Sequence, residues 1–382
     1  MKSGAITVGM DARLANAARR VGVGNYCREV LRALAPMAEK ESVRLRVYLD
    51  APPLPGFPEL HGAEASVLPR GRFWTQRVLG RELRRRPPDV FFSPALQIPL
   101  GCPCPVVATV HDLAYYEFPR HFTRRRLLLA RLQSRHAARR ADHLIADSEA
   151  TAADIGRYLH VGSERITVAL LAPAARYREP VARDRIDTVR GALGLDAPYI
   201  LYVGRIQPRK NIKRLIAAFE RAMERHPEAP HSLVIAGGKG WLHEGVFERA
   251  KRSPLAERIR FTGHVADEYL PALMKGADAL ALVSLSEGFG LPVIEAMACG
   301  TPVITSNCSS LAEVAGDAAL LVDPRDVENI AAAIGDLVAR HELQEMLRAK
   351  GLVRASAFSW ETTARRVLDA TMAAAGRSPK HG

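Results

Sequence analysis

The chain has 382 residues, of which 48% are hydrophobic and 25% charged, and its formal net charge is +13. This balance excludes a mainly disordered protein, and five cysteines in this length exclude a disulfide scaffold. No apolar stretch approaches the ~20 residues that span a bilayer, and the first residues lack a signal peptide's apolar core, so we expect a cytoplasmic protein with reduced thiols.

Short β-branched runs alternate with helical stretches through the first half of the chain. Both faces of these runs are apolar, which is typical of a parallel sheet covered by helices on both sides. The predicted strands are 6–10, 45–49, 90–92, 106–110, 143–146 and 166–168.

A segment with prolines and arginines, 172–180, interrupts the pattern and is the predicted linker. The alternation then restarts, with predicted strands at 199–203, 233–236, 259–261, 279–283 and 303–305. Between the first two, apolar residues of 212–223 fall on one helical face, with Asn211 as the expected N-cap. The sequence therefore predicts an α/β protein of two doubly wound domains, whose ligands bind at the carboxyl ends of the strands.

The strongest motif runs from Ser286 to Pro302. Gly288 and Gly290 let a ligand approach the backbone, and the free N–H groups of the following helix suit phosphate or sugar oxygens. Glu287 and Glu295 are carboxylates that accept hydrogen bonds from hydroxyls of a sugar and a ribose. The alternative is an ordinary strand–loop–helix connection with two solvated glutamates.

A second motif, 203–211, also follows a strand and precedes a helix. Arg205 and Lys210 bracket its loop, where two cations can neutralise a diphosphate, although no P-loop pattern is present. The alternative is a solvated basic turn.

Two weaker signals lie in the first half. Gly22-Val23-Gly24 is similar to a phosphate-binding loop, but it lacks the third glycine of a dinucleotide fingerprint, which disfavours a nicotinamide cofactor; a tight turn into a helix is the alternative. His111 directly follows a predicted strand, where it can donate to a substrate hydroxyl or have a structural role alone. Asp147 ends the next strand and either borders the same site or belongs to a helix cap.

The excess positive charge lies in the first half, because residues 1–178 carry a net +12 and residues 179–382 a net +1. Such a field attracts nucleic acid, a phospholipid surface or a phosphorylated substrate. The segment Arg120 to Arg140 holds eight arginines, no Asp or Glu, and several interleaved leucines. It predicts a basic amphipathic helix for an anionic membrane surface, the alternative being a solvated helix with a core-facing leucine stripe.

With these residues in place, the chain resembles the retaining glycosyltransferases of family 4, which have the GT-B fold, over essentially its whole length. The most specific part is the pair Glu287 and Glu295, eight positions apart, with the glycines around them. The resemblance implies two domains that face a central cleft: an acceptor-binding domain, 1–175 with 362–382 crossing back onto it, and a donor-binding domain, 176–361.

The resemblance also implies a role for each motif. Glu295 would bind the donor ribose and Glu287 the transferred sugar. Arg205 and Lys210, helped by the Gly22–Gly24 loop, would hold the diphosphate, and His111 would contact the sugar near its reacting face. The other donor-binding residues implied are Gly204, Gly288, Phe289, Gly290 and Leu291.

Residues 291–324 look most like bacterial mannosyltransferases that use GDP-mannose. The implied activity is a retaining, metal-independent and cofactor-free transfer of a hexose to a glycan or lipid-linked acceptor, at the cytoplasmic face of a membrane. A UDP-sugar-dependent glycosyltransferase and a nucleotide-sugar epimerase are alternatives. A nucleic-acid-binding protein is disfavoured because aromatic residues for base stacking are few near the arginine runs.

Overall fold

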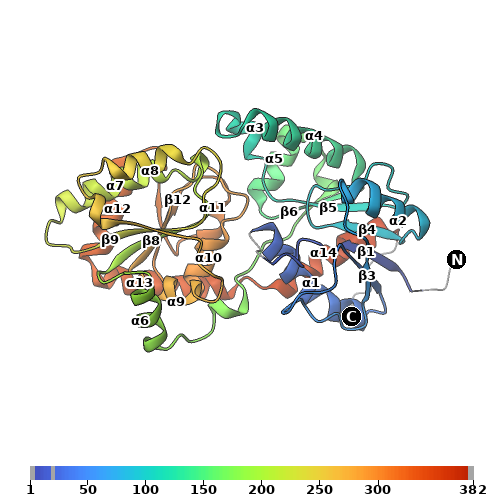
Figure 1. The fold of residues 1–382 in the computed structure, drawn as a ribbon, viewed down its shortest axis with the longest axis horizontal. Helices are drawn as coiled ribbons and strands as arrows, with labels where there is room; N and C mark the ends of the chain where they lie inside the picture. Colours follow the sequence, from blue (N-terminus) through green and yellow to red (C-terminus); the bar gives the residue numbers. More distant parts are fainter. Residues whose placement is uncertain (1–4, 19–21, 377–382) are drawn as a thin grey trace. The chain divides into compact units, whose positions relative to one another are not determined.

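The computed structural model describes residues 5–18 and 22–376 (Figure 1). Its packing divides the chain into two compact units. Of the described residues, the first unit comprises 5–18, 22–113, Leu128–Leu171 and 359–376, and the second comprises Ala114–Leu127 and Ala172–Phe358. Within the described residues, no helix is both long and apolar enough to cross a bilayer.

The first unit is built on a parallel sheet of seven strands in the order β3-β2-β1-β4-β5-β6-β7. The strands are β1 Thr7–Asp11, β2 Arg44–Leu49, β3 Glu64–Val67, β4 Val90–Ser93, β5 Val106–Val110, β6 His143–Ala146 and β7 Ile166–Val168. All residues of β1, β4 and β5 are buried, as their two-sided apolar pattern predicts. The order reverses between β1 and β4, which places a topological switch point at their carboxyl ends.

Helices from both ends of the chain cover this sheet. Helix α1, Val23–Lys40, packs against the final helix α14, Trp360–Ala374, which also contacts strands β4 to β7. The Thr363 hydroxyl of α14 donates to the Leu170 carbonyl just beyond β7. The remaining helices along this part of the chain are α2 Gly80–Arg85, α4 Arg124–Arg140 and α5 Glu149–Leu159.

The second unit repeats the architecture with six parallel strands in the order β10-β9-β8-β11-β12-β13. The strands are β8 Tyr199–Val203, β9 Ser232–Ala236, β10 Ile259–Gly263, β11 Ala279–Leu282, β12 Val303–Ser306 and β13 Leu320–Val322. Its helices are α3 Ala114–Glu117, α6 Arg183–Ala192, α7 Ile212–Arg225, α8 Glu244–Lys251, α9 Leu270–Lys275, α10 Leu291–Ala298, α11 Ser309–Ala315, α12 Val327–Ala339 and α13 His341–Ser356. The prediction of two doubly wound α/β domains is confirmed.

The segment 114–127 lies between strands of the first sheet in the sequence but packs within the second unit. Trp241 holds it there: the indole Nε1 donates to the His121 carbonyl at 2.6 Å, and the ring lies 5.4 Å from that of Phe122. The guanidinium of Arg126 lies 4.8 Å from the centre of the Trp241 ring, in a cation–π contact. This aromatic packing explains why the segment belongs to the second unit although the residues before and after it in the chain belong to the first.

The expected N-cap of α7 is wrong in one respect. Asn211 does stand at the N-cap position, but its backbone is left-handed, with φ 60°, and its side chain makes no capping bond. The Asn211 Nδ2 donates instead to the carbonyls of Val283, at 2.9 Å, and Pro324, at 2.6 Å. The side chain therefore fastens three loops at the carboxyl edge of the second sheet.

Candidate functional site

Glu287 is the centre of a buried ion cluster at the carboxyl edge of the second sheet. One carboxylate oxygen, Oε1, accepts from the Lys210 ammonium at 2.5 Å and from the Ser284 hydroxyl at 2.6 Å. The other, Oε2, accepts from the Arg209 guanidinium at 3.1 Å. Glu287 and Arg209 are each no more than 9% exposed. The structure thus excludes a solvated Glu287, and in the basic turn it excludes a solvated Lys210.

The cluster keeps Glu287 ionised. Burial alone would raise the pKa of its carboxyl, but the charges of Lys210 and Arg209 and the bonds from Lys210 and Ser284 lower it to about 2. Two basic side chains face one carboxylate, so the three side chains together carry a formal net charge of +1. An anionic ligand would therefore be attracted to this edge of the sheet.

The backbone around Glu287 is fixed by the start of α11. The Glu287 N–H donates to the Ser309 hydroxyl at 3.1 Å, and the Ser310 hydroxyl donates to the Glu287 carbonyl at 2.9 Å. The following loop turns through Gly290, whose φ is 96° and where a Cβ would lie 2.5 Å from Leu311. A glycine is required there, and it sets the direction of α10.

Helix α10 begins at Leu291 and its first turn contains Pro292, as the motif predicts. Glu295 lies in this helix and is 9% exposed, so the second glutamate of the motif is buried too. Phe289 is 3% exposed and packs edge-on against Phe358, with ring centres 5.9 Å apart. The side chain of Phe289 is therefore part of the core under the loop.

The loop after β8 lies against the loop after β9. The Ile206 N–H donates to the Gly238 carbonyl and the Gly240 N–H to the Ile206 carbonyl. A Cβ at Gly237 would lie 1.9 Å from the carbonyl oxygen of Gly204, so the two backbones meet where no side chain fits. Arg205, next to Gly204, is exposed, in contrast to the enclosed Lys210. The loop thus offers one exposed cation, Arg205, and one that is paired with Glu287, Lys210.

In the first unit, His111 is held at both ring nitrogens. Its Nδ1 lies 2.7 Å from Oδ2 of Asp147 and its Nε2 2.8 Å from the Pro94 carbonyl oxygen. Burial alone would lower the pKa of His111, but the Asp147 charge and both hydrogen bonds raise it. Burial raises the pKa of Asp147, which is 2% exposed. The neighbouring Ser148, rather than Asp147, caps α5 by accepting from the Thr151 N–H.

Helix α1 connects His111 to the glycine pair. Gly22 is the N-cap residue of α1, with φ 24°, and Gly24 is buried within the first turn. Tyr26, in the same turn, meets the His111 ring edge-on at 4.8 Å and shares a 2.9 Å hydrogen bond with the Thr109 hydroxyl. The glycine loop and His111 therefore belong to one packed group in the first unit.

The structure brings Lys210 and Glu287 into direct contact, which the sequence did not predict. Sequence analysis missed Arg209 as the second partner of Glu287, and left the role of Asp147 open. A signal was present for Arg209, because it adjoins Lys210 in the same short turn, 208–210. Gly22, Gly24 and His111 lie in the first unit, and the other predicted site residues lie in the second.

The leucines of α4 do not face the core. Leu128, Leu129 and Leu132 are 61%, 48% and 54% exposed. The alternative of a core-facing leucine stripe is therefore wrong. Small residues, Ser134, Ala137 and Ala138, take the buried side of the helix instead.

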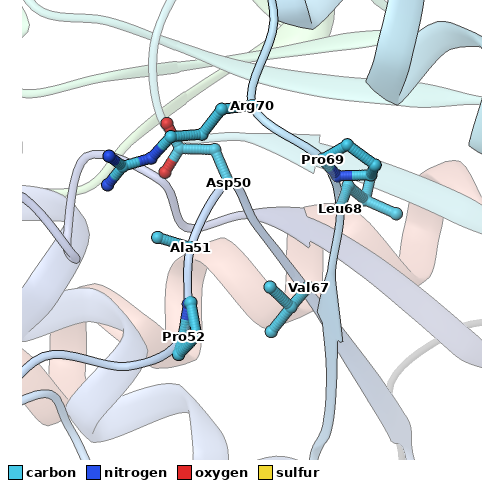
Figure 2. A pocket seen from close by; sticks show the side chains of 7 residues that line it. All are labelled: Asp50, Ala51, Pro52, Val67, Leu68, Pro69 and Arg70. Carbon is cyan, nitrogen blue, oxygen red and sulfur yellow. The ribbon is translucent and has the colours of Figure 1, made fainter.

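A separate pocket of about 570 Å³ lies at the carboxyl ends of β2 and β3 (Figure 2). It is lined by 50–52, which follow β2, and by 67–70, at and after the end of β3. None of the predicted site residues lines it.

Comparison with known proteins identifies the family. Residues 186–353 match the family of glycosyl transferases group 1, and residues 21–169 match glycosyltransferase family 4. O-antigen chain mannosyltransferase B of Escherichia coli is 32% identical over 265 residues, which is 69% of this chain and 69% of that protein. D-inositol 3-phosphate glycosyltransferase of Rhodococcus opacus is 33% identical over 63% of this chain, which spans 56% of that longer protein.

Solved structures share the fold at low sequence identity. WaaG, a glycosyltransferase involved in lipopolysaccharide biosynthesis, has a TM-score of 0.71 and 18% identity, covering 96% of this chain and 99% of that one. Anabaena HepE in complex with UDP and glucose has a TM-score of 0.71 and 19% identity, covering 95% and 98%. The chain is therefore a glycosyltransferase of the GT-B fold, with a family 4 domain followed by a group 1 domain.

Proposed function

We propose that the chain transfers a hexose, with retention, from a nucleoside-diphosphate sugar to a glycan or lipid-linked acceptor, and that the donor is GDP-mannose. The observation that carries the donor site is the cluster of Glu287 with Lys210 and Arg209, which leaves an excess positive charge beside the start of α10. The preference for mannose rests on the similarity to the O-antigen mannosyltransferase.

The chemistry needs a cation where the leaving group forms. Cleavage of the anomeric bond develops negative charge on the departing diphosphate and an oxocarbenium-like sugar, and only interactions that strengthen in that state accelerate the reaction. Arg205 is exposed, and the cluster around Lys210 is held rigid by its buried carboxylate. Together with the N–H groups that begin α10, these cations would stabilise the diphosphate without reorganising.

The acceptor side of the reaction uses the leaving group as base. In the front-face displacement that we propose, the departing phosphate takes the acceptor's proton, and no protein nucleophile is required. His111 would contact the sugar near the reacting carbon. The Nε2–H of His111 donates to the Pro94 carbonyl in this structure. To bond to the sugar through the same N–H, the imidazole would have to release that carbonyl.

The donor assignment can be tested by thermal unfolding with GDP-mannose, UDP-glucose and the free nucleotides. A ligand at 100 times its Kd should stabilise the protein by about 2.7 kcal/mol. Lys210→Ala should lower kcat about a hundredfold or more, because it removes a donor from the transition state. The exposed Lys213→Ala, at the second residue of α7, is the matched control. Full turnover by Lys210→Ala would contradict the electrostatic account.

Two related activities are separated by product analysis. A UDP-sugar-dependent transferase has support from the structural likeness to HepE, which was solved with UDP and glucose. It would be stabilised by UDP-glucose rather than by GDP-mannose. A nucleotide-sugar epimerase would change the donor with no acceptor present, and NMR of the anomeric region would show this directly.

We also propose that α4 places the enzyme at the cytoplasmic face of an anionic membrane. One side of this helix presents Leu128, Leu129 and Leu132 to solvent. Arg124, Arg125, Arg135 and Arg139 are exposed on the same helix, and none of its residues is acidic. Leucines can enter the headgroup boundary, and each basic side chain near an anionic surface contributes about 1 kcal/mol.

Flotation with anionic vesicles at low salt tests this placement. The wild type should float, and replacement of all three leucines by serine should abolish it. Val353→Ser, at a residue 73% exposed on α13, is the control and should float like the wild type. If the triple variant floated as well as the wild type, the leucines of α4 would not bind the membrane.

A further inference from the structure

The pocket at the ends of β2 and β3 has chemistry of its own. Asp50 and Arg70 supply a carboxylate and a guanidinium, whereas Pro52, Val67 and Leu68 supply apolar surface. In the view of Figure 2 the charged ends of Asp50 and Arg70 are drawn at one end of the pocket, with Pro52 and Val67 toward the other. The hollow measures about 570 Å³ and is open, because Pro52, Val67 and Arg70 are exposed, so it would cover one side of a ligand rather than enclose it.

The two charged groups are available to a ligand. Within the part of the chain that the structure describes, neither the Asp50 carboxylate nor the Arg70 guanidinium makes a hydrogen bond or ion pair. Asp50 is half-buried and Arg70 is exposed. A polar ligand would therefore gain hydrogen bonds to charged partners without first breaking any in this part of the chain.

One wall of the pocket is rigid. Asn16, which is 6% exposed, donates through Nδ2 to the carbonyls of Ala51, at 3.1 Å, and Pro52, at 3.0 Å. Its Oδ1 accepts from the Leu54 N–H at 2.8 Å. Both the Nδ2 and the Oδ1 of Asn16 thus bond to the backbone of the loop after β2. This loop is therefore held in place before any ligand binds.

The lining selects among ligand classes. A carboxylate beside a guanidinium disfavours a bare phosphate or an anionic lipid headgroup, because Asp50 would repel it. No aromatic side chain lines the pocket, so a nucleobase finds no stacking surface. A neutral polyhydroxylated ring fits both parts, since its hydroxyls can donate to Asp50 and accept from Arg70 while its C–H faces lie on proline, valine and leucine.

The pocket is far from His111 along the same edge of the sheet. Both follow carboxyl ends of strands, but β2 and β5 are separated by β1 and β4. Three strand spacings of about 4.8 Å put roughly 14 Å between them, which is longer than one hexose ring. The loops between carry polar groups: Arg13 donates to the Gln97 side chain at 2.5 Å.

We infer that the pocket of Asp50 and Arg70 is a distal acceptor subsite. It binds one sugar ring of an extended glycan, several sugar units away from the ring whose hydroxyl reacts. The subsite rests on the proposed function and specifies its acceptor, which is an oligosaccharide rather than a monosaccharide or a small phosphorylated polyol. Elongation of an existing chain is the reaction class that such a subsite serves.

Acceptor length is the measurement that tests the subsite. The probes are methyl α-mannoside and an α-linked mannotetraose, each assayed for KM and for binding by saturation-transfer NMR. The wild type should show a KM for the tetrasaccharide about 10–100-fold below that for the methyl mannoside, the range expected for hydrogen bonds to charged groups. Asp50→Asn and Arg70→Ala should remove this advantage and leave the KM of the methyl mannoside unchanged.

The control is Arg44→Ala, because Arg44 is an exposed arginine at the opposite end of β2. It should keep the full length dependence. Equal KM values and equal NMR binding for short and long saccharides in the wild type would overturn the subsite. Failure of the proposed function would look different: no donor would stabilise the protein, while the tetrasaccharide would still bind in the NMR experiment and lose binding in Asp50→Asn.

Discussion

Glu287 in the second unit and Asp147 in the first are both buried carboxylates at the carboxyl edge of a parallel sheet, yet their pKa values shift in opposite directions. Glu287 faces the basic side chains of Lys210 and Arg209, and its pKa falls to about 2. Asp147 faces an imidazole and a buried surrounding that raises its pKa. Burial is common to both, so the partner decides the outcome.

The two pairs are therefore suited to different work. The cluster around Glu287 is a permanent charge arrangement with a net +1, which a diphosphate can use without a change of protonation. The pair of His111 and Asp147 shares a proton, and the hydrogen bond from Nδ1 orients the ring. One unit supplies fixed electrostatics, and the other supplies a positioned, titratable group.

The largest expected effect is on stability when Glu287 is neutralised. Glu287→Gln leaves Arg209 and Lys210, whose side chains are 10% and 12% exposed, without their counter-charge. Removing one partner of a buried pair costs about 3–5 kcal/mol. Urea unfolding of this variant would measure the loss, with the exposed Glu268→Gln as control, expected within about 0.5 kcal/mol of the wild type. A urea midpoint for Glu287→Gln equal to that of the wild type would show that Arg209 and Lys210 do not need the charge of Glu287.

Acid should reveal the same interaction. Because the folded-state pKa of Glu287 is about 2 and its ordinary value is 4.5, its contribution to stability is complete above pH 4.5 and is lost as the pH falls toward 2. The linked free energy is about 3 kcal/mol. The difference in unfolding free energy between wild type and Glu287→Gln should therefore shrink over this range. A difference that stays constant down to pH 2 would show that Glu287 is not held by charge.

A smaller effect is expected in the first unit. Asp147→Asn removes the charge that raises the pKa of His111, so that pKa should fall, as measured by NMR titration of the imidazole Cε1–H. Glu164→Gln, at an exposed carboxylate of the same unit, should leave the titration unchanged. An unaltered His111 titration in Asp147→Asn would mean that the Pro94 carbonyl, not the carboxylate, governs the ring.

Most of the strands were predictable because their apolar pattern is two-sided. Strands β5, β6 and β8 have the predicted bounds. Strand β3 was missed since it is half-exposed at the edge of its sheet, where Glu64 and Ser66 break the apolar run. Strand β13 was missed because only one of its three residues is β-branched, whereas all three residues of the equally short β7 are, and β7 was predicted.

The site was predictable to the level of residue types and not of pairings. The glycines, the proline and the two glutamates of 286–302 have local meanings that a sequence carries. That two adjacent cations, Arg209 and Lys210, both reach Glu287 depends on the short turn at 208–210 and on the left-handed Asn211 after it. Such backbone choices are set by contacts with loops that are distant in the sequence, such as Pro324.

The aromatic segment 114–127 bears on how this enzyme can be taken apart. Although the family 4 match runs unbroken over 21–169, a fragment cut at those ends would carry Phe122 and His121 away from the Trp241 that receives them. The fragment would then expose the aromatic side chain of Phe122 to solvent, and the remainder would expose the indole of Trp241. No single cut leaves this segment with Trp241, because 114–127 lies between β5 and β6 of the first sheet, so separate production is expected to expose apolar surface on both halves.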